Sequence, residues 1–240
     1  MEKRTELYKG KAKTVYATDD PHRLVMHYRD DVSAFDGAKL AQLAGKGETN
    51  NRINAFVMGK LAAAGVPTHF VTLLNERESL VKAMQMVPVE CVVRNVCAGS
   101  MAKRYGIVEG TRLPEPVFEF FLKSDALHDP LCNDDHIRVL GWATAREIAE
   151  MKDITHGVNA VLKPLFAAAG IDLVDYKLEF GHPTDDPAGP LVLGDEFTPD
   201  GCRLWDAKTG EKLDKDRFRR DLGEVIEHYR EVAQRIGVPL

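Results

Sequence analysis

The stretch that decides the fold runs from residue 171 to residue 180 and reads Ile171-Asp172-Leu173-Val174-Asp175-Tyr176-Lys177-Leu178-Glu179-Phe180. Side chains alternate between the two faces of a strand, so the even-numbered residues from 174 onward form one apolar face. The opposite face carries Asp175, Lys177 and Glu179 in succession. Such a row is ordinarily a solvent-exposed face on which charges of alternating sign pair with their neighbours. Here the row interrupts a sequence that otherwise has the composition of a core strand.

A second apolar run, Leu191-Val192-Leu193-Gly194, follows and ends in Asp195-Glu196. It brings a further pair of carboxylates to the point where a loop begins. Carboxylate oxygens from adjacent strands suit Mg²⁺, which beside a nucleotide phosphate usually takes only one or two protein ligands plus water. We therefore expect Glu179 and Asp195 to be metal ligands, with Lys177 placed to hold an anionic substrate against them.

The patterns on either side of these two strands predict an α+β protein. Short β-branched or alternating runs, separated by turn residues, predict strands at 5–8, 14–17, 24–28, 87–93, 171–180 and 191–197. Apolar residues at helical spacing predict helices at 53–64, 99–105, 145–169 and 218–236. The capping-box spacing of Thr144 and Glu147 marks the start of the third helix, and Pro164 should kink or end it. Polar, proline-rich composition predicts loops at 109–117 and 182–190.

The composition excludes several classes of protein. The chain has 240 residues, 44% of them hydrophobic and 29% charged, which suffices for a core in one large domain or two lobes and excludes disorder. With 32 Lys and Arg against 37 Asp and Glu, the net charge of -5 argues against binding nucleic acid through a general positive field. Any phosphate-binding charge must therefore be concentrated locally.

The sequence has neither a signal-peptide pattern nor a cysteine motif, and this indicates the compartment and the state of the cysteines. The first twenty residues contain no apolar signal-peptide core, and no run approaches the ~18 apolar residues that span a bilayer, so we expect a cytoplasmic protein. The cysteines are scattered, with no C-x-x-C pair, and we expect buried thiols in place of a zinc site or a disulfide framework. They are Cys91, Cys97, Cys132 and Cys202.

The segment from Tyr8 to Tyr16 places Gly10 and three lysines between two short predicted strands. A small turn residue lets the backbone approach phosphates, and alternate lysines direct ammonium groups to one side. This pattern favours a phosphate-binding hairpin. An edge hairpin protected by lysines remains the alternative interpretation. The glycine spacing is neither that of a Walker A loop nor that of a dinucleotide fingerprint.

Two polar, glycine-containing loops, 33–37 and 45–51, precede the first predicted helix. A helix N-terminus binds carboxylates or phosphates through its free N–H groups, so the second loop is a candidate anion site, although ordinary turn and cap chemistry explains both loops as well. Arg94, near Ser100, and Arg203 have side chains suited to bidentate recognition of phosphate or carboxylate. Either arginine would serve equally well in a salt bridge.

Six segments, taken together, carry a resemblance that none of them carries alone. They are Gly10-Lys-Ala-Lys-Thr-Val-Tyr16, Lys46-Gly-Glu-Thr-Asn-Asn51, Pro88-Val-Glu-Cys-Val-Val-Arg-Asn-Val-Cys-Ala-Gly-Ser100, Leu122-Lys-Ser-Asp-Ala-Leu-His-Asp-Pro130, Val174-Asp-Tyr-Lys-Leu-Glu-Phe-Gly181 and Gly194-Asp-Glu-Phe-Thr-Pro-Asp-Gly-Cys-Arg-Leu-Trp-Asp206. In this order they resemble the SAICAR synthetase family, the phosphoribosylaminoimidazole-succinocarboxamide synthases, in its short bacterial type. The resemblance covers nearly the whole chain.

The resemblance implies a fold and a reaction. The fold has two lobes, an N-terminal antiparallel sheet over residues 1–85 and a larger C-terminal lobe of sheet and helices over 86–240, with the ATP cleft between them. The reaction is a step of de novo purine biosynthesis, in which ATP drives amide formation between carboxyaminoimidazole ribonucleotide (CAIR) and L-aspartate, through an acyl phosphate. The implied cofactors are ATP and Mg²⁺. The implied partners are these small molecules and further copies of the chain, with neither nucleic acid nor membrane.

The resemblance also implies roles for individual residues. Those placed at ATP are Gly10, Lys11, Ala12, Lys13, Val15, Lys82 and Met86, with Glu179 and Asp195 holding Mg²⁺ beside them. Those placed at the ribonucleotide's phosphate and carboxylate groups are Arg94, Ser100 and Arg203. Those placed at the aspartate end are Ser33, Asp36, Gly37, Lys46, Gly47 and Asn50. Those placed at the reacting groups as catalytic residues are Asp175, Lys177, Lys123 and Asp129.

Two other functions fit parts of the sequence. Asp175-x-Lys177 on a strand with nearby carboxylates imitates the core of a Mg²⁺-dependent nuclease, which would cleave DNA without ATP but leaves the lysine hairpin unexplained. A nucleotide-sensing module would keep the same pocket without turnover. The joint presence of phosphate lysines, metal carboxylates and anion-binding arginines favours the enzyme.

Overall fold

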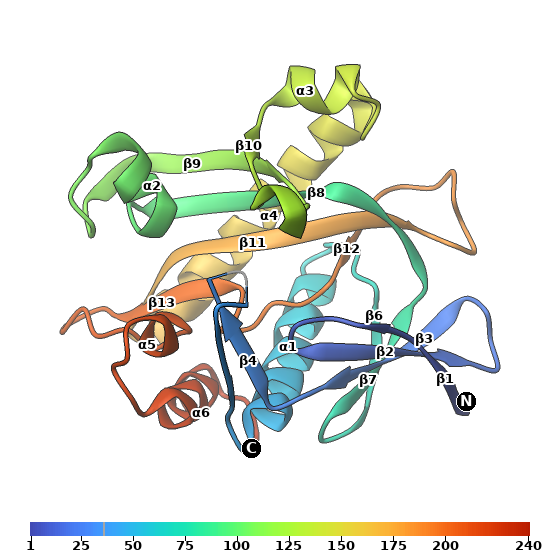
Figure 1. Cartoon of the computed structure of the whole chain (residues 1–240), viewed down its shortest axis with the longest axis horizontal. Helices are drawn as coiled ribbons and strands as arrows, with labels where there is room; N and C mark the ends of the chain where they lie inside the picture. Colours follow the sequence, from blue (N-terminus) through green and yellow to red (C-terminus); the bar gives the residue numbers. More distant parts are fainter. Residues whose placement is uncertain (36) are drawn as a thin grey trace.

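Two antiparallel sheets form the framework of the molecule, as a computed structural model describes it for residues 1–35 and 37–240 (Figure 1). The smaller, five-stranded sheet has the order β1-β2-β3-β7-β6. Its strands are β1 (Lys3–Lys9), β2 (Lys13–Thr18), β3 (Arg23–Tyr28), β6 (Phe70–Asn75) and β7 (Glu78–Lys82). The fold class expected from the sequence, α+β, is confirmed.

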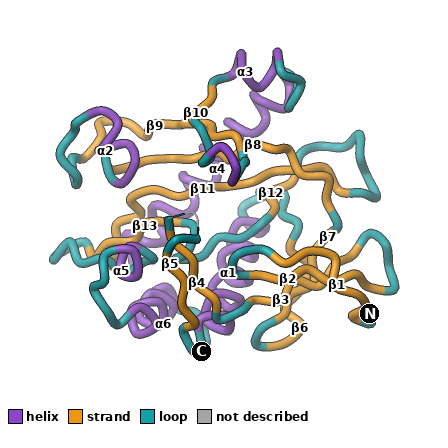
Figure 2. The backbone as a smooth tube through the Cα atoms, in the orientation of Figure 1, coloured by secondary structure: helices purple, strands orange, loops and turns teal. Residues whose placement is uncertain are grey.

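The larger, six-stranded sheet has the order β10-β9-β8-β11-β12, and β13 also pairs with β11. Its strands are β8 (Met84–Val96), β9 (Arg112–Leu122), β10 (Leu131–Cys132), β11 (Ile171–Pro183), β12 (Val192–Gly194) and β13 (Cys202–Asp206). β11 lies at the centre because β8 pairs along one of its edges while β12 and β13 share the other edge. Figure 2 shows the two sheets apart, with β8, β9 and β11 across the upper part and β1, β2 and β3 at lower right.

The helices connect and cover these sheets, and a separate hairpin of two strands lies beside them. The helices are α1 (Lys46–Ala63), α2 (Gly99–Tyr105), α3 (Asp134–Val139), α4 (Ala145–Ala168), α5 (Asp216–Arg219) and α6 (Val225–Ile236), with a 3₁₀ turn at Asp125–Leu127. The hairpin consists of β4 (Asp31–Ala34) and β5 (Lys39–Gln42). Within the described residues, none of the helices is both long and apolar enough to cross a membrane.

The main core lies between the larger sheet and the helices α1, α4 and α6, with α4 passing behind β8 and β11 (Figure 1). Tyr176, Leu178 and Phe180 enter this core, as the alternation predicts. Val174 does not, because the pairing of β11 with β13 is irregular between Leu173 and Asp175. Val174 instead belongs to a small cluster with Trp205. Such an irregularity re-aims side chains, and here it separates the two apolar groups of β11.

Several predicted elements are confirmed, including the first three strands, helix α2 and the start of helix α4. The capping box is present, since the Thr144 hydroxyl accepts from the Glu147 N–H at 3.2 Å and the Glu147 carboxylate accepts from the Thr144 N–H at 2.6 Å. Pro164 does not end the helix, which continues to Ala168. Cys91, Cys97 and Cys202 are buried, Cys132 is half-buried, and none forms a disulfide.

Replacing the capping hydroxyl tests how far this box stabilises α4. We expect Thr144→Ala to lower the free energy of unfolding by about 1 kcal/mol, because the exposed end of α4 loses the acceptor for one of its free N–H groups. Urea denaturation monitored by circular dichroism measures the change. Thr72→Ala, on an exposed strand residue, is the control and should change stability by less than about 0.5 kcal/mol. An equal effect of both substitutions would contradict the capping role.

Other predicted elements are wrong at their boundaries. The loop expected at 109–117 becomes strand β9 from Arg112 onward. Its prolines are tolerated because they lie where the pairing with β8 is irregular, between Val117 and Arg112. The final helix begins only at Val225, since residues 221, 223 and 224 all have positive φ and break the helical path after α5. The strand expected at 191–197 covers only residues 192–194.

Candidate active site

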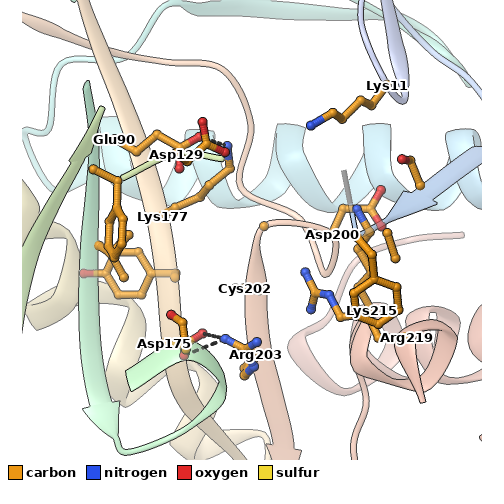
Figure 3. A pocket seen from close by; sticks show the side chains of 18 of the residues that line it. Lys11, Glu90, Asp129, Asp175, Lys177, Asp200, Cys202, Arg203, Lys215 and Arg219 are labelled. Atoms are coloured by element: carbon orange, nitrogen blue, oxygen red, sulfur yellow. Dashed lines mark hydrogen bonds and ion pairs between the residues drawn. The ribbon is translucent and has the colours of Figure 1, made fainter. Parts of the chain in front are cut away.

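A cleft of about 440 Å³ is lined by strands β8, β11 and β13 of the larger sheet and by residues of the segments 33–35, 200–201 and 215–219 (Figure 3). The sequence-predicted residues that line it come from six different parts of the chain. They are Lys11, Ser33, Arg94, Ser100, Asp129, Asp175, Lys177 and Arg203. The structure therefore brings together residues that lie as far apart as 11 and 203 in the sequence.

Arg94 is fixed by three partners at the base of the cleft. Its Nε donates to Glu119 Oε2 at 2.6 Å, its Nη1 to Asp175 Oδ2 at 3.1 Å and its Nη2 to Ser100 Oγ at 3.1 Å. The pairing of β8 with β11 sets Arg94 directly opposite Asp175. Because the guanidinium is buried, these charge-assisted bonds hold it in a single orientation.

Arg203, on β13, reaches the same carboxylate from the other edge of β11. Its Nη1 donates to Asp175 Oδ2 at 2.9 Å and its Nε to Asp216 Oδ2 at 3.0 Å. Burial lowers the pKa of Arg203, but the two carboxylates raise it by more, so the group is always charged. Gly99 has a φ of +56° and lies against this guanidinium, where any side chain would collide with it. Asp175 thus holds two arginines side by side at one end of the cleft.

Lys177 lies two residues further along β11, between two carboxylates. Its Nζ is 2.5 Å from Glu90 Oε1 and 3.0 Å from Glu179 Oε1, and Lys123 binds the second oxygen of Glu179. Burial lowers the pKa of Lys177, but Glu179 and Glu90 raise it well above its ordinary value. Burial also raises the pKa of Glu90, against the effect of Lys177. Lys177 is therefore a fixed positive charge and not a base at neutral pH.

The second carboxylate group lies beside Glu179, because β12 pairs with β11 so that Gly194 is opposite Glu179. Asp195 follows with a φ of +52°, a conformation that costs energy in a residue other than glycine. Lys13 binds the Asp195 carboxylate and also contacts Glu196 at 2.9 Å. Burial raises the pKa of Asp195, but the nearby ammonium groups of Lys13, Lys177 and Lys123 lower it by more. The pKa of Asp195 therefore lies below its usual range.

Residues 1–35 and 37–240 contain no group of three or more His, Cys, Asp or Glu side chains that could hold a metal ion. Glu179 on β11 and Asp195, directly after β12, nevertheless provide two carboxylates with hard oxygen donors. Mg²⁺ takes only one or two such ligands from a protein when phosphates and water supply the rest. Three ammonium groups now pair with these two carboxylates. The donor set therefore fits Mg²⁺ that arrives with a polyphosphate.

Of the remaining residues expected at ATP, only Lys11 lines the cleft. Gly10 and Ala12 form the turn between β1 and β2, and Lys11 at its tip pairs with Asp125 at 2.8 Å. Val15 lies in β2, and Lys82 ends β7. Met86 lies close to Gly194, so that a Cβ added there would meet its Sδ at 3.2 Å.

Of the residues expected at the aspartate end, Ser33 lines the cleft, and Lys46 and Asn50 lie behind it, where both contact the cleft residue Asp200. Lys46 is 1% exposed, and its Nζ is 2.6 Å from Asp200 Oδ2. Asn50 Nδ2 and the Tyr229 hydroxyl donate to the same carboxylate, both at 2.9 Å. The Gly47 N–H instead donates to Asp30, and Gly37 has open space around it. Asp36 lies outside the described residues.

Four charged side chains of the cleft were not foreseen from the sequence: Glu90, Asp200, Lys215 and Arg219. Glu90 was detectable, because it is the one charged residue in an otherwise β-branched run, Val87 to Val93. Asp200 lies in a turn-forming Thr-Pro-Asp-Gly segment, which has an ordinary loop composition. The other two have the spacing of an exposed helix face, so nothing local distinguishes them from surface residues.

Comparisons with known proteins cover the whole chain. The family model described as SAICAR synthetase matches residues 6–236. The chain is 63% identical over 240 residues to the phosphoribosylaminoimidazole-succinocarboxamide synthase of Idiomarina loihiensis, covering 100% of both chains. It is 61% identical over 238 residues to that of Hahella chejuensis, covering 99% of each.

Solved structures with similar folds carry the same description. The crystal structure of phosphoribosylaminoimidazole-succinocarboxamide synthase from Ehrlichia chaffeensis superposes with a TM-score of 0.96 at 44% identity, covering 98% of this chain and 100% of that one. A SAICAR synthetase (Type-2) in complex with ADP superposes with a TM-score of 0.92 at 45% identity, covering 97% of this chain and 99% of that one.

Proposed function

This chain belongs to the SAICAR synthetase family, and from that premise we propose that it joins CAIR to L-aspartate while splitting ATP into ADP and phosphate. It is a ligase, and the relatives it matches are named phosphoribosylaminoimidazole-succinocarboxamide synthases. The observation that carries the proposal is the row Asp175, Lys177 and Glu179, which links an arginine pair at one end to a carboxylate pair at the other. An anionic substrate and a metal-bound triphosphate would meet along this row.

The ribonucleotide would bind at the arginine end. Arg94, Ser100 and Arg203 offer donors suited to its phosphate and carboxylate groups. Asp175 would accept a hydrogen bond from the ring amine while keeping both arginines in place. The nucleotide would bind at the hairpin of Gly10, Lys11, Ala12 and Lys13, near Val15, Lys82 and Met86. This placement is supported by the similarity to a SAICAR synthetase whose structure was solved with ADP.

Glu179 and Asp195 would hold Mg²⁺, which when bound neutralises charge on the transferred phosphoryl group. The carboxylate oxygen of CAIR attacks the γ-phosphorus, the bond to ADP breaks, and an acyl phosphate forms. The aspartate amine then attacks the acyl carbon, phosphate leaves, and the nitrogen loses a proton. Lys177 and Lys123 would stabilise negative charge through both steps, and Asp129 lines the same cleft as Lys177.

The lobes, the aspartate end, the compartment and the assembly would also be those that the resemblance implies. The lobes would divide near residue 85, with the nucleotide between residues 1–85 and 86–240. Ser33, Asp36 and Gly37 would cover the aspartate end. The reaction would take place in the cytoplasm, in a homo-oligomer that binds small molecules.

A labelled substrate tests this reaction directly. We expect the purified protein to form ADP and the succinocarboxamide product only with ATP, CAIR and L-aspartate together, and EDTA to stop turnover until Mg²⁺ is added in excess. With ¹⁸O in the CAIR carboxylate, one labelled oxygen should appear in the released phosphate, which mass spectrometry detects. Phosphate without label would contradict the acyl phosphate. Cleavage of DNA by the same preparation without ATP would favour the nuclease.

A further inference from the structure

Asp214, just before α5, is a carboxylate that the protein buries without pairing it to a cation. The residue is 0% exposed. Within residues 1–35 and 37–240 its carboxylate forms no ion pair, while the neighbouring Arg203 pairs with Asp175 and Asp216 instead. Burial raises the pKa of Asp214 to about 7, and the nearby carboxylate of Asp216 contributes to that rise. Such a group is costly to bury unless hydrogen bonds compensate for the lost water.

Two backbone N–H groups supply those hydrogen bonds, and they belong to different elements. The Leu204 N–H, in the middle of β13, donates to Asp214 Oδ2 at 2.8 Å. The Asp216 N–H, in the first residue of α5, donates to Asp214 Oδ1 at 2.7 Å. Figure 1 shows α5 lying beside β13. The carboxylate therefore joins the strand to the helix, with one oxygen on each.

Both of the joined positions bear on Arg203. Leu204 follows Arg203 directly in β13, so holding its N–H holds the backbone from which the arginine side chain extends. Asp216 is the acceptor for Arg203 Nε at 3.0 Å, so holding its N–H holds the partner that orients the guanidinium. The same guanidinium then donates through Nη1 to Asp175 Oδ2 at 2.9 Å. Asp214 thus fixes the origin and the direction of one side chain without touching it.

We propose that Asp214 is a positioning residue for Arg203, which it aims into the cleft by holding β13 and α5 together. The inference rests on the proposed function, which places Arg203 at the ribonucleotide. A carboxylate suits this position because each of its oxygens accepts from one of the two N–H groups. An amide of the same shape has a single acceptor oxygen, and its NH₂ group would face one of the two donors.

Steady-state kinetics of Asp214→Asn tests this role. We expect the KM for CAIR to rise about five- to twentyfold, because one buried N–H loses its acceptor and Arg203 is no longer held in place. The KM for ATP should change less than twofold, since the nucleotide is assigned to the other end of the cleft.

Asp206→Asn is the matched control. The Asp206 carboxylate, at the end of β13, also accepts from two backbone N–H groups, those of Lys208 at 2.9 Å and Thr209 at 2.8 Å, but it does not line the cleft. This substitution should lower the midpoint of thermal unfolding and leave both KM values unchanged. A loss of stability alone would then be distinguished from a loss of positioning.

A double-mutant cycle measures whether Asp214 acts through Arg203. In an Arg203→Lys background the guanidinium is absent, so adding Asp214→Asn should raise the KM for CAIR by less than about twofold more. If Asp214→Asn does not fold, Asp214→Ser replaces it in both backgrounds. An equal rise in both backgrounds, an equal rise in the KM for ATP, or an unchanged KM for CAIR would overturn the proposal. Absence of product from CAIR with the wild-type protein would instead overturn the proposed function.

Discussion

Lys177→Met is expected to lower kcat/KM by about 10³-fold while changing the free energy of unfolding by less than about 1 kcal/mol. The ammonium is held between Glu90 and Glu179, and its raised pKa keeps it charged at every pH used for assays. Its loss removes a preorganised positive charge from the place where negative charge develops. Methionine keeps the length of the side chain, so packing along β11 should be preserved.

Coupled assays of ADP release and urea denaturation measure the two effects. Lys163→Met is the matched control, because Lys163 lies exposed on α4 and forms no described interaction. It should leave both activity and stability unchanged. Near-normal turnover by Lys177→Met would contradict the place given to Lys177, whereas a large loss of stability would show that the lysine mainly stabilises the sheet.

Asp195→Asn is expected to lower kcat by about 10² to 10³-fold at ordinary Mg²⁺ concentrations. The substitution removes the charge of one of the two carboxylates proposed as metal ligands, while an amide of the same shape remains. Lys13 keeps its contact with Glu196 at 2.9 Å, so the fold should be little affected. The half-saturating Mg²⁺ concentration should therefore increase at least tenfold, as measured by titrating the metal at saturating substrates.

The control for this experiment is Asp185→Asn, in the loop between β11 and β12. Asp185 pairs with Arg23 at 3.0 Å on the surface, a pair that contributes little to stability. We expect its Mg²⁺ dependence to match that of the wild-type protein. A normal Mg²⁺ titration for Asp195→Asn would remove Asp195 from the proposed metal site.

Much of the larger sheet was predictable because its residues carry their own pattern. The alternation in β11 identified both its apolar face and the charged row of Asp175, Lys177 and Glu179. The alternation could not show the irregularity at Leu173, since that depends on how β13 pairs with β11. Short strands such as β10 were missed for the same reason, because tertiary pairing and not local propensity makes them strands.

The arginine end was only partly predictable. Arg94, Ser100 and Arg203 were singled out, but Glu119, the partner of Arg94, lies in a strand predicted in part as loop. Lys215 was overlooked because only the fold brings it to the cleft, and no local sequence pattern distinguishes it from a surface lysine. For Lys46, the sequence pattern indicated a loop that binds an anionic ligand. In the structure Lys46 begins α1, and its ammonium group pairs with the buried carboxylate of Asp200.

The distance between the arginine end of the cleft, at Asp175, and the carboxylate end, at Glu179, is set by one continuous stretch of β11. From Asp175 to Glu179 the pairing of β11 with β8 is regular, and irregularities occur only outside that interval, next to Gly181 and Leu173. Four residues of extended chain span ~13 Å, a length that covalent geometry sets and that no surface loop can alter. Insertions or deletions in the 182–190 connection should therefore leave catalysis intact, whereas a single residue added within 175–179 would misalign both ends at once.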